Sequence, residues 1–530
     1  MVYALKLLAV VLVVIGLAAY VFRSAFSELF TPDDYKRVWF LVALCALASY
    51  LCVYPAVFLL AVAVVALYGG GVTGHGPVGK IGLYLLFACI LPPINLQLGG
   101  FGGINYVLNL ESRRIAAIVL LSWAAIEIVA RKSAPRAASF LGIDLLVVGY
   151  QALRFALQVP HSTFTTMVRM VVEATLDVLL PYFVVTRGVR SMADIRFVGG
   201  HLLVGIAFVA AIGVTETVLQ HNLYSGLQSI YDVQWQLTYA LMRGGLIRVQ
   251  ATTPQPIILA FVLLFGFGVA YWLKGAQWRR PSAMALFAAI LIAEVSTFSR
   301  GPWLGLAVVM LALVAMRRMS VVAFRSLVVA LLLVAVGLKL AGADKQVVTA
   351  LGAMFGSEQA DIASIEYRRE LLDTALALIQ QSPWLGVPNY AAQMQSLKQG
   401  EGIIDIVNSY VAIMLDAGLV GLTVYLLPFV VVFIRLHSAA RSRASALASA
   451  NNRFPLAFAA LILGCLFSIF TASTFGIIPV LLTLLLSLST AWLGLPQDER
   501  SDVAAAADIP LDVREDPMAR HRARFGGYPS

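Results

Sequence analysis

Residues 4–22, with the sequence ALKLLAVVLVVIGLAAYVF, form an apolar run that contains a single charged residue, Lys6. An α-helix needs about 20 mostly apolar residues to cross the hydrocarbon core of a bilayer. Similar runs occupy most of the 530-residue chain, which is 60% hydrophobic and only 12% charged. A soluble core cannot bury that much apolar surface. The sequence therefore predicts an all-α polytopic membrane protein in which the first run is a retained helix.

The apolar runs predict 12–14 transmembrane helices. The second run, 38–68, is too long to cross once as a straight helix with a rise of about 1.5 Å per residue. We expect Pro55 to kink this run or to split it into a re-entrant pair, and we count the run once. The runs lie near 4–22, 38–68, 80–96, 113–130, 142–158, 165–186, 197–217, 255–274, 282–298, 302–316, 321–341, 418–434, 454–471 and 474–494.

The formal charge of +10 comes from Lys and Arg residues in short connectors, not on one amphipathic face, which argues against a nucleic-acid partner. When 38–68 is counted once, most of these connectors fall on one side of the membrane. The positive-inside rule assigns that side to the cytoplasm. Arg113 and Arg114 break the alternation. The connector residues are Arg131, Lys132, Arg136, Arg187, Arg190, Arg196, Lys274, Arg279, Arg280, Arg317, Arg318, Arg435, Arg441, Arg443 and Arg453.

The topology divides the chain into a transmembrane helical bundle, residues 1–494, and a polar tail. Segments near 97–112, 219–250 and 342–406 lie outside, and 342–406 is a large, partly helical periplasmic loop. Residues 495–530 have mixed charge and no apolar periodicity, so we expect a disordered cytoplasmic tail. The four cysteines lie inside apolar runs without metal-ligand spacing, and the sequence indicates no metal and no cofactor.

The segment Ser296-Thr297-Phe298-Ser299-Arg300-Gly301-Pro302-Trp303 joins two apolar runs at the outer face. Ser299 suits an N-cap, and Pro302 suits the first turn of the next helix. The free N–H groups at that helix start would point outward beside Arg300, and together they would form an anion site. The alternative is an interfacial arginine whose side chain extends to water.

The segment from Ser364 to Gln381 predicts an amphipathic helix in the large outer loop. Arg368 falls on its expected apolar stripe, so this side chain needs an anion, which is either an acidic side chain or a ligand phosphate. Arg369 turns to the polar side, where Asp373 is its i+4 partner. The residues of the expected stripe are Ile365, Leu372, Leu376 and Ile379.

Four motifs follow one another between Val295 and Ile434. They are Ser-Arg-Gly-x-Trp-Leu from Ser299, Arg-x-Glu-Leu from Arg368, Pro-x-Leu-Gly from Pro383 and Gly-Leu-x-Gly-Leu from Gly418. In this order, the motifs resemble those of the bacterial O-antigen ligase and O-antigen or exopolysaccharide polymerase superfamily. Each motif is loose by itself, and the specificity lies in their order and spacing.

The resemblance implies a C-type glycosyltransferase of the bacterial inner membrane, with its active site facing the periplasm. Such enzymes take a glycan from undecaprenyl pyrophosphate without a nucleotide sugar or an essential metal. By motif, Arg300 and Arg368 correspond to the arginines that grip the lipid pyrophosphate. Membrane lipid and a chain-length regulator are further expected partners.

One departure concerns the position where ligases carry a His before an Asn. This sequence has Val407 before Asn408, which favours a polymerase over a ligase. Asp405 then becomes the catalytic candidate as an orienting or hydrogen-bond-accepting group, with helix capping as its alternative role. The remaining residues of the candidate substrate site are Arg369, Asn408, Tyr410 and Glu401.

Two other functions stay open from the sequence. One is a ligase that moves a finished glycan onto a lipid core, and the other is a transporter of lipid-linked sugars. Ionisable residues inside the spans are candidates for function or for pairing between helices. These residues are Glu127, Asp144, Arg154, Glu173, Asp177, Glu216 and Glu294.

Overall fold

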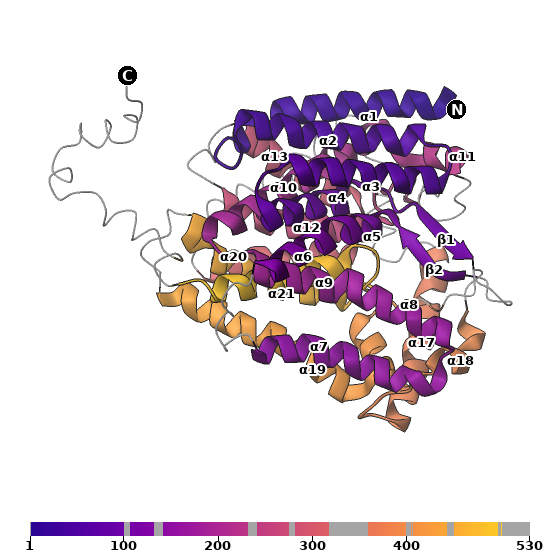
Figure 1. The fold of residues 1–530 in the computed structure, drawn as a ribbon. Helices are drawn as coiled ribbons and strands as arrows, with labels where there is room; N and C mark the ends of the chain where they lie inside the picture. Colours follow the sequence, from indigo (N-terminus) through magenta and orange to yellow (C-terminus); the bar gives the residue numbers. More distant parts are fainter. Residues whose placement is uncertain are drawn as a thin grey trace, which may run out of the picture.

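The computed structural model describes residues 2–99, 106–131, 141–231, 241–274, 281–316, 359–398, 404, 406–442, 450–496 and 500. Within these ranges the chain is a bundle of long helices with two small antiparallel hairpins (Figure 1). Six described helices are long and apolar enough to cross a membrane, and five shorter apolar helices accompany them. The predicted all-α polytopic membrane protein is therefore confirmed. The expected span 321–341 and nearly all of the expected tail 495–530 lie outside the described residues.

In the first quarter of the chain, the run 38–68 contributes two helices and not the single crossing that we counted from the sequence. This run forms two helices, α2 (Pro32–Leu51) and α3 (Pro55–Val72), between α1 (Val2–Val21) and α4 (Gly76–Ile90). Pro55 does not kink one helix, because it stands at the first position of α3, where its missing N–H would have no intrahelical partner anyway. At the start of α2, the Thr31 hydroxyl accepts the Asp34 N–H and Pro32 follows the cap.

Contacts between distant connectors define two ends of the bundle. At one end, Phe197 at the start of α10 (Met192–Leu219) packs against both Phe30 and His75. We call this the basic end. At the other end, Tyr50 donates to the Leu223 carbonyl over 2.7 Å. We call this the hairpin end, because it carries β1–β2, and Figure 1 shows the N-terminus on the same side.

Counting two helices moves the connector 22–31 to the basic end. Phe30 packs there, and the Ser24 hydroxyl contacts that of Ser282, at the start of α13 (Pro281–Ser296). Arg23, in this connector, and Lys36, in the first turns of α2, therefore join the other basic connectors. The corrected count agrees with the positive-inside rule better than the single count did.

Arg113 and Arg114 remain at the hairpin end, and the structure explains this exception. They lie in α5 (Ser112–Ala116), where Arg114 pairs with Asp177 over 2.9 Å and Arg113 pairs with Glu111 over 3.3 Å. Asp177 belongs to the π-helical turn η5 (Thr175–Leu179). These charges are neutralised inside the bundle and do not act as free loop charges.

The remaining elements follow the predicted order of spans. The hairpins are β1 (Asn95–Gly99) with β2 (Tyr106–Glu111) and β3 (Met242–Arg243) with β4 (Leu246–Ile247). The middle helices are η2 (Ala117–Leu121), α6 (Ser122–Ala130), α7 (Leu141–Gln158), α8 (Phe164–Ala174), α9 (Leu180–Gly188), η6 (Leu223–Leu227) and α11 (Gln228–Tyr231). The later helices are α12 (Pro256–Leu273), α14 (Arg300–Ala315), α17 (Gln359–Gln381), α18 (Tyr390–Gln393), η9 (Gln395–Leu397), α19 (Ser409–Ser442), α20 (Ala450–Ile469) and α21 (Ile478–Leu493).

The two ends make a topology prediction. In a Cys52→Ser background, an impermeant thiol reagent added from outside should label Gln393→Cys, which is exposed at the end of α18. It should spare Arg441→Cys in the last turn of α19 and Glu28→Cys in the connector 22–31. The three remaining native cysteines are buried and should give little background. Labelling at Glu28→Cys would restore the single count of 38–68, and labelling at Arg441→Cys would invert the whole assignment.

Candidate functional site

A tight turn joins α13 to α14 and holds the first predicted arginine. Phe298 adopts a left-handed backbone with φ of 49°, which is strained for a bulky residue. Two arginines at the β3–β4 hairpin hold this turn in place. Arg248 donates to the Thr297 carbonyl over 2.9 Å, and Arg243 donates to the Phe298 carbonyl over 3.1 Å. Neither of these two arginines was a candidate from the sequence, since no helical or motif spacing links them to residue 298.

Arg300 is the first residue of α14 and is exposed, as the sequence predicted. Pro302 lies in the first helical turn. Ser299 occupies the N-cap position, but its hydroxyl makes no capping bond and instead accepts from Arg248 over 3.0 Å. The hydroxyl thus ties the start of α14 to the hairpin rather than to the helix.

Gly301 brings this turn against the loop between α20 and α21. A Cβ at position 301 would lie 1.9 Å from the Thr471 hydroxyl oxygen, so only glycine permits the contact. The same loop continues to Ser473, whose hydroxyl donates to the Ile406 carbonyl over 3.1 Å. The loop between α20 and α21 therefore connects the Arg300 turn to the segment that leads into α19.

The Pro-x-Leu-Gly motif at Pro383 and the Gly-Leu-x-Gly-Leu motif at Gly418 pack against each other. We call this contact the interlock. Gly418 breaks α19 with φ of 63° and ψ of −163°, and the loop after α17 fills the break. Three backbone hydrogen bonds join the two segments: Val387 N–H to Leu415 O at 2.7 Å, Leu419 N–H to Pro383 O at 2.9 Å, and Val420 N–H to Trp384 O at 3.1 Å. The loop supplies partners for groups that the broken helix cannot pair internally.

The structure confirms the predicted outer helix as α17, but its buried face differs from the predicted apolar stripe. Leu371, Ala375 and Leu378 are buried, whereas Leu372 and Leu376 are 40% and 42% exposed. Ile379 is buried as predicted, but the rest of the described stripe is one residue out of the predicted register, because the packing partners Met394, Leu397 and Leu415 select the face. These partners come from later segments and are not visible in the helix's own pattern.

The two outer arginines keep different positions on α17. Position 368 lies three residues before Leu371, on the buried face, although the Arg368 side chain lies outside the described residues. Arg369 is exposed, as expected for the solvated side.

At the start of α19, the candidate residues Asn408 and Tyr410 make structural hydrogen bonds. The Asn408 side-chain oxygen accepts the N–H groups of Tyr410 and Val411 at 2.9 and 3.3 Å, so Asn408 is the N-cap. The Tyr410 hydroxyl donates to the Leu466 carbonyl over 2.6 Å and ties α19 to α20. Glu401 and Asp405 lie outside the described residues. Asn408 thus occupies the capping position that was the alternative role for Asp405.

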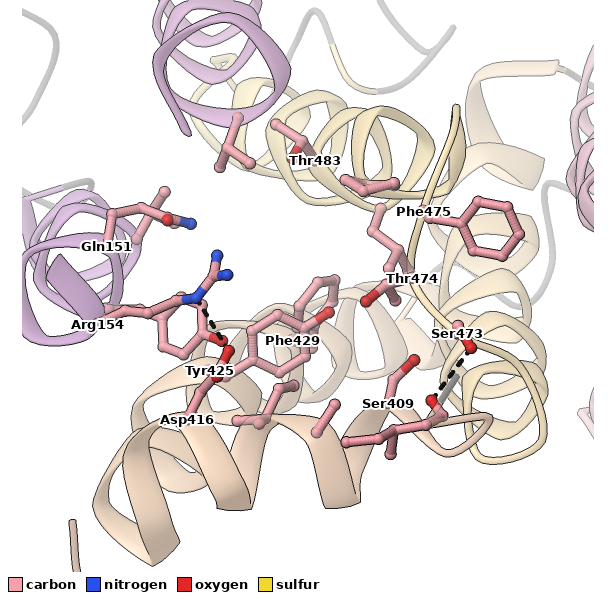
Figure 2. Close-up of a pocket in the computed structure, with 18 of the residues that line it drawn as sticks. Gln151, Arg154, Ser409, Asp416, Tyr425, Phe429, Ser473, Thr474, Phe475 and Thr483 are labelled. Atoms are coloured by element: carbon pink, nitrogen blue, oxygen red, sulfur yellow. Dashed lines mark hydrogen bonds and ion pairs between the residues drawn. The ribbon is translucent and has the colours of Figure 1, made fainter. Parts of the chain in front are cut away.

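A cavity of about 850 Å³ opens between α7, α9, α19 and α21. Its membrane side is lined by apolar residues that include Val147, Phe429 and Leu482. Its other side carries polar groups, and Figure 2 shows Arg154 and Asp416 on one wall with Ser409 and Ser473–Thr474 on the opposite wall. The loop 471–475 that packs against Gly301 forms part of that opposite wall.

Most of the ionisable residues inside the spans pair with neighbouring segments. Glu294 is the exception within the described ranges, because its carboxyl is 1% exposed and neither oxygen has a hydrogen-bond partner there. The paired groups are Glu127 with Lys80, Glu173 and Asp177 with Arg114, Asp144 with Arg187, Arg154 with Asp416, and Glu216 with the N–H groups of Leu223, Gln250 and Ala251. The described part of the chain contains no group of three His, Cys, Asp or Glu residues that could hold a metal ion.

The interlock predicts a large effect of a small substitution. Gly418→Ala would place a methyl group 2.3 Å from the backbone carbonyl of Trp384 and would force an alanine to adopt a positive φ. We expect it to destabilise the protein by more than about 1 kcal/mol, measured as thermal unfolding in detergent. Gly149→Ala in α7 is the control, since nothing lies within 4 Å of its added methyl group. That control should be neutral or stabilising by up to about 1 kcal/mol. Equal unfolding temperatures for both variants would contradict the close backbone contact.

Residues 283–426 match the family model described as O-antigen ligase. The matched range runs from α13 through the Arg300 turn and α17 to the interlock at Gly418. No curated protein matches the chain.

Proposed function

We propose that this chain, whose residues 283–426 match the O-antigen ligase family model, joins lipid-linked oligosaccharide repeat units into a polysaccharide. The reaction would take place at the hairpin end, which the positive-inside rule assigns to the periplasmic face of a bacterial inner membrane. Undecaprenyl pyrophosphate is the proposed carrier.

One observation carries the proposal: the Arg300 turn packs through Gly301 against the loop between α20 and α21, and the same loop lines a largely apolar cavity with Ser473, Thr474 and Phe475. An apolar cavity suits a polyprenyl chain, because burying methylene groups is favourable. The Arg300 guanidinium, exposed at the start of α14, would contact the carrier's phosphates through charge-assisted hydrogen bonds. The superfamily match covers the turn itself.

The proposed step is a displacement at an anomeric carbon. The acceptor hydroxyl oxygen forms the new bond to that carbon while the bond between the carbon and the pyrophosphate oxygen breaks. The electron pair of the broken bond leaves on the pyrophosphate, whose growing negative charge Arg300 and Arg368 would stabilise. The hydroxyl proton passes to the pyrophosphate or to Asp405, and a strong general base is not needed for so good a leaving group.

The polymerase is preferred to a ligase because Val407 replaces the histidine that ligases carry before Asn408. A ligase that moves a glycan to a lipid core is the alternative. A chain-length regulator is a proposed partner of the polymerase, and neighbouring genes for such a regulator and for a flippase would favour it.

The arginine assignment is tested by substitution. Arg300→Ala and Arg368→Ala should each abolish glycan joining by the purified protein while leaving its unfolding temperature unchanged. Arg→Lys should rescue poorly, because lysine cannot make the bidentate contact with phosphate. Arg369→Ala should be mild, since an exposed helical pair is worth about 0.3–0.5 kcal/mol.

The assay contains lipid-linked oligosaccharides in detergent, without any ion gradient, and its product is a longer glycan on one lipid. A transporter would give no product under these conditions. Equal losses at Arg368 and Arg369 would contradict the assignment of the two residues to different faces of α17.

Substitutions at the start of α19 distinguish helix capping from a role in the reaction. Asn408→Ala should cost about 1 kcal/mol of stability, and Asn408→Asp should keep the cap and the activity. Asp405→Asn should lower the rate of glycan joining without changing the unfolding temperature, because the cap belongs to Asn408. A wild-type rate for Asp405→Asn, together with a lower unfolding temperature for Asp405→Ala, would assign Asp405 to structure alone.

A further inference from the structure

We propose that Arg154, held by Asp416, binds a phosphate group of a second polyprenyl carrier, on the cavity wall opposite the loop that packs against the Arg300 turn. The inference rests on the proposed function and deepens it. A polymerase brings together two lipid-linked glycans, a donor and an acceptor, and each carries its own pyrophosphate. Arg300 and Arg368 serve the donor, and Arg154 serves the acceptor.

The guanidinium of Arg154 is anchored through one nitrogen. Its Nε donates to the Asp416 carboxylate over 3.2 Å, across the junction of α7 and α19. Figure 2 shows the two terminal nitrogens directed away from this carboxylate and into the cavity, near Gln151. The Arg154 side chain remains 40% exposed. An arginine fixed at Nε presents its other two nitrogens as a fork that matches two phosphate oxygens.

The surroundings fit the head of a lipid rather than a free anion. Arg154 lies one turn before the end of α7 at Gln158, so it is near the hairpin end of the bundle. The same cavity continues past Val147 and Leu146 on α7 toward Leu486 on α21. A phosphate at Arg154 would therefore have apolar cavity wall on its membrane side for the carrier's chain.

A second arginine–aspartate pair, Arg187 with Asp144, is an example of an ion pair that only joins two helices. Asp144 accepts from Arg187 and also from the Tyr182 hydroxyl at 2.8 Å, while Arg187 donates to the Thr186 hydroxyl at 2.6 Å. This pair joins α7 to α9 and lies outside the cavity lining. The pair at Arg154 differs because its guanidinium faces the open volume.

The wall opposite Arg154 belongs to the loop that packs against the Arg300 turn. This loop, 471–475, contributes Ser473 and Thr474 to that wall. Carriers held at the two walls would direct their glycans toward the same space at the rim. A ligase with a single polyprenyl carrier has no use for the second position.

The test counts bound lipids on the full-length protein by native mass spectrometry. Undecaprenyl phosphate should bind with two molecules per chain to the wild type and with one to Arg154→Gln. The affinity of the second molecule should fall roughly ten- to hundredfold, the loss expected for hydrogen bonds to a charged group. Arg154→Lys should fall between the two. Arg187→Gln is the matched control and should still bind two molecules.

Two further probes identify what Arg154 recognises. Undecaprenol, which lacks the phosphate, should not compete for the second site, and inorganic pyrophosphate alone should bind there much more weakly than the lipid. Two molecules on Arg154→Gln at wild-type affinity would overturn the proposal, and so would equal binding of undecaprenol. Pyrophosphate that binds as tightly as the lipid would overturn its assignment to a lipid head.

The glycan-joining assay separates this inference from the proposed function. If wild-type protein joins no glycans but loses its second lipid on Arg154→Gln, the function fails and the lipid site stands. If the wild type joins glycans and Arg154→Gln matches it in both rate and lipid count, the lipid site fails and the function stands. Asp416→Asn should weaken the second site less than Arg154→Gln, because its side-chain oxygen still accepts from Nε.

Discussion

The structure depends on three backbone hydrogen bonds between the loop Pro383–Val387 and the broken helix α19. Where a helix breaks at membrane depth, its orphaned N–H and C=O groups must find other partners, because lipid offers none. Here the loop after α17 provides them, and Gly418 and Gly386 let the two backbones approach closely enough. The break ends the first segment of α19 beside the cavity, with Asp416 facing Arg154. The interlock, together with the packing of α17 against Leu415, fixes the outer loop relative to this cavity wall.

The same contact explains why the motifs stand in a fixed order along the chain. The loop that fills the break follows α17, so the position of Arg368 on α17 is set relative to α19 by the intervening residues. On the other side, Ser409 at the start of α19 donates to the Ala472 carbonyl over 2.6 Å, in the loop that also contacts Gly301. A chain of short contacts thus connects the outer helix, the break and the Arg300 turn.

Local signals in the sequence predicted local structure well. Proline in the first turn after Arg300 and the apolar runs themselves located α14 and most other spans. A split at Pro55 was one of the two expected outcomes, but the run was still counted as one crossing because the link between α2 and α3 is short and almost as apolar as the helices. The buried face of α17 was missed by one residue because distant partners select it. The pair of Arg154 and Asp416 joins positions 262 residues apart, and no pattern within either helix indicates it.

The hydrogen bonds from Arg243 and Arg248 at the β3–β4 hairpin to the Arg300 turn bear on the pH range over which the site keeps its shape. Their donors are guanidinium groups and their acceptors are carbonyl and hydroxyl oxygens, and none of these changes protonation between mildly acidic and mildly alkaline pH. The interlock at Gly418 consists of backbone groups alone and is equally indifferent to acid and base. These two parts of the site should therefore keep their shape across this range, and any pH dependence of the reaction reports on carboxylates, such as Asp416, and on substrate phosphates instead.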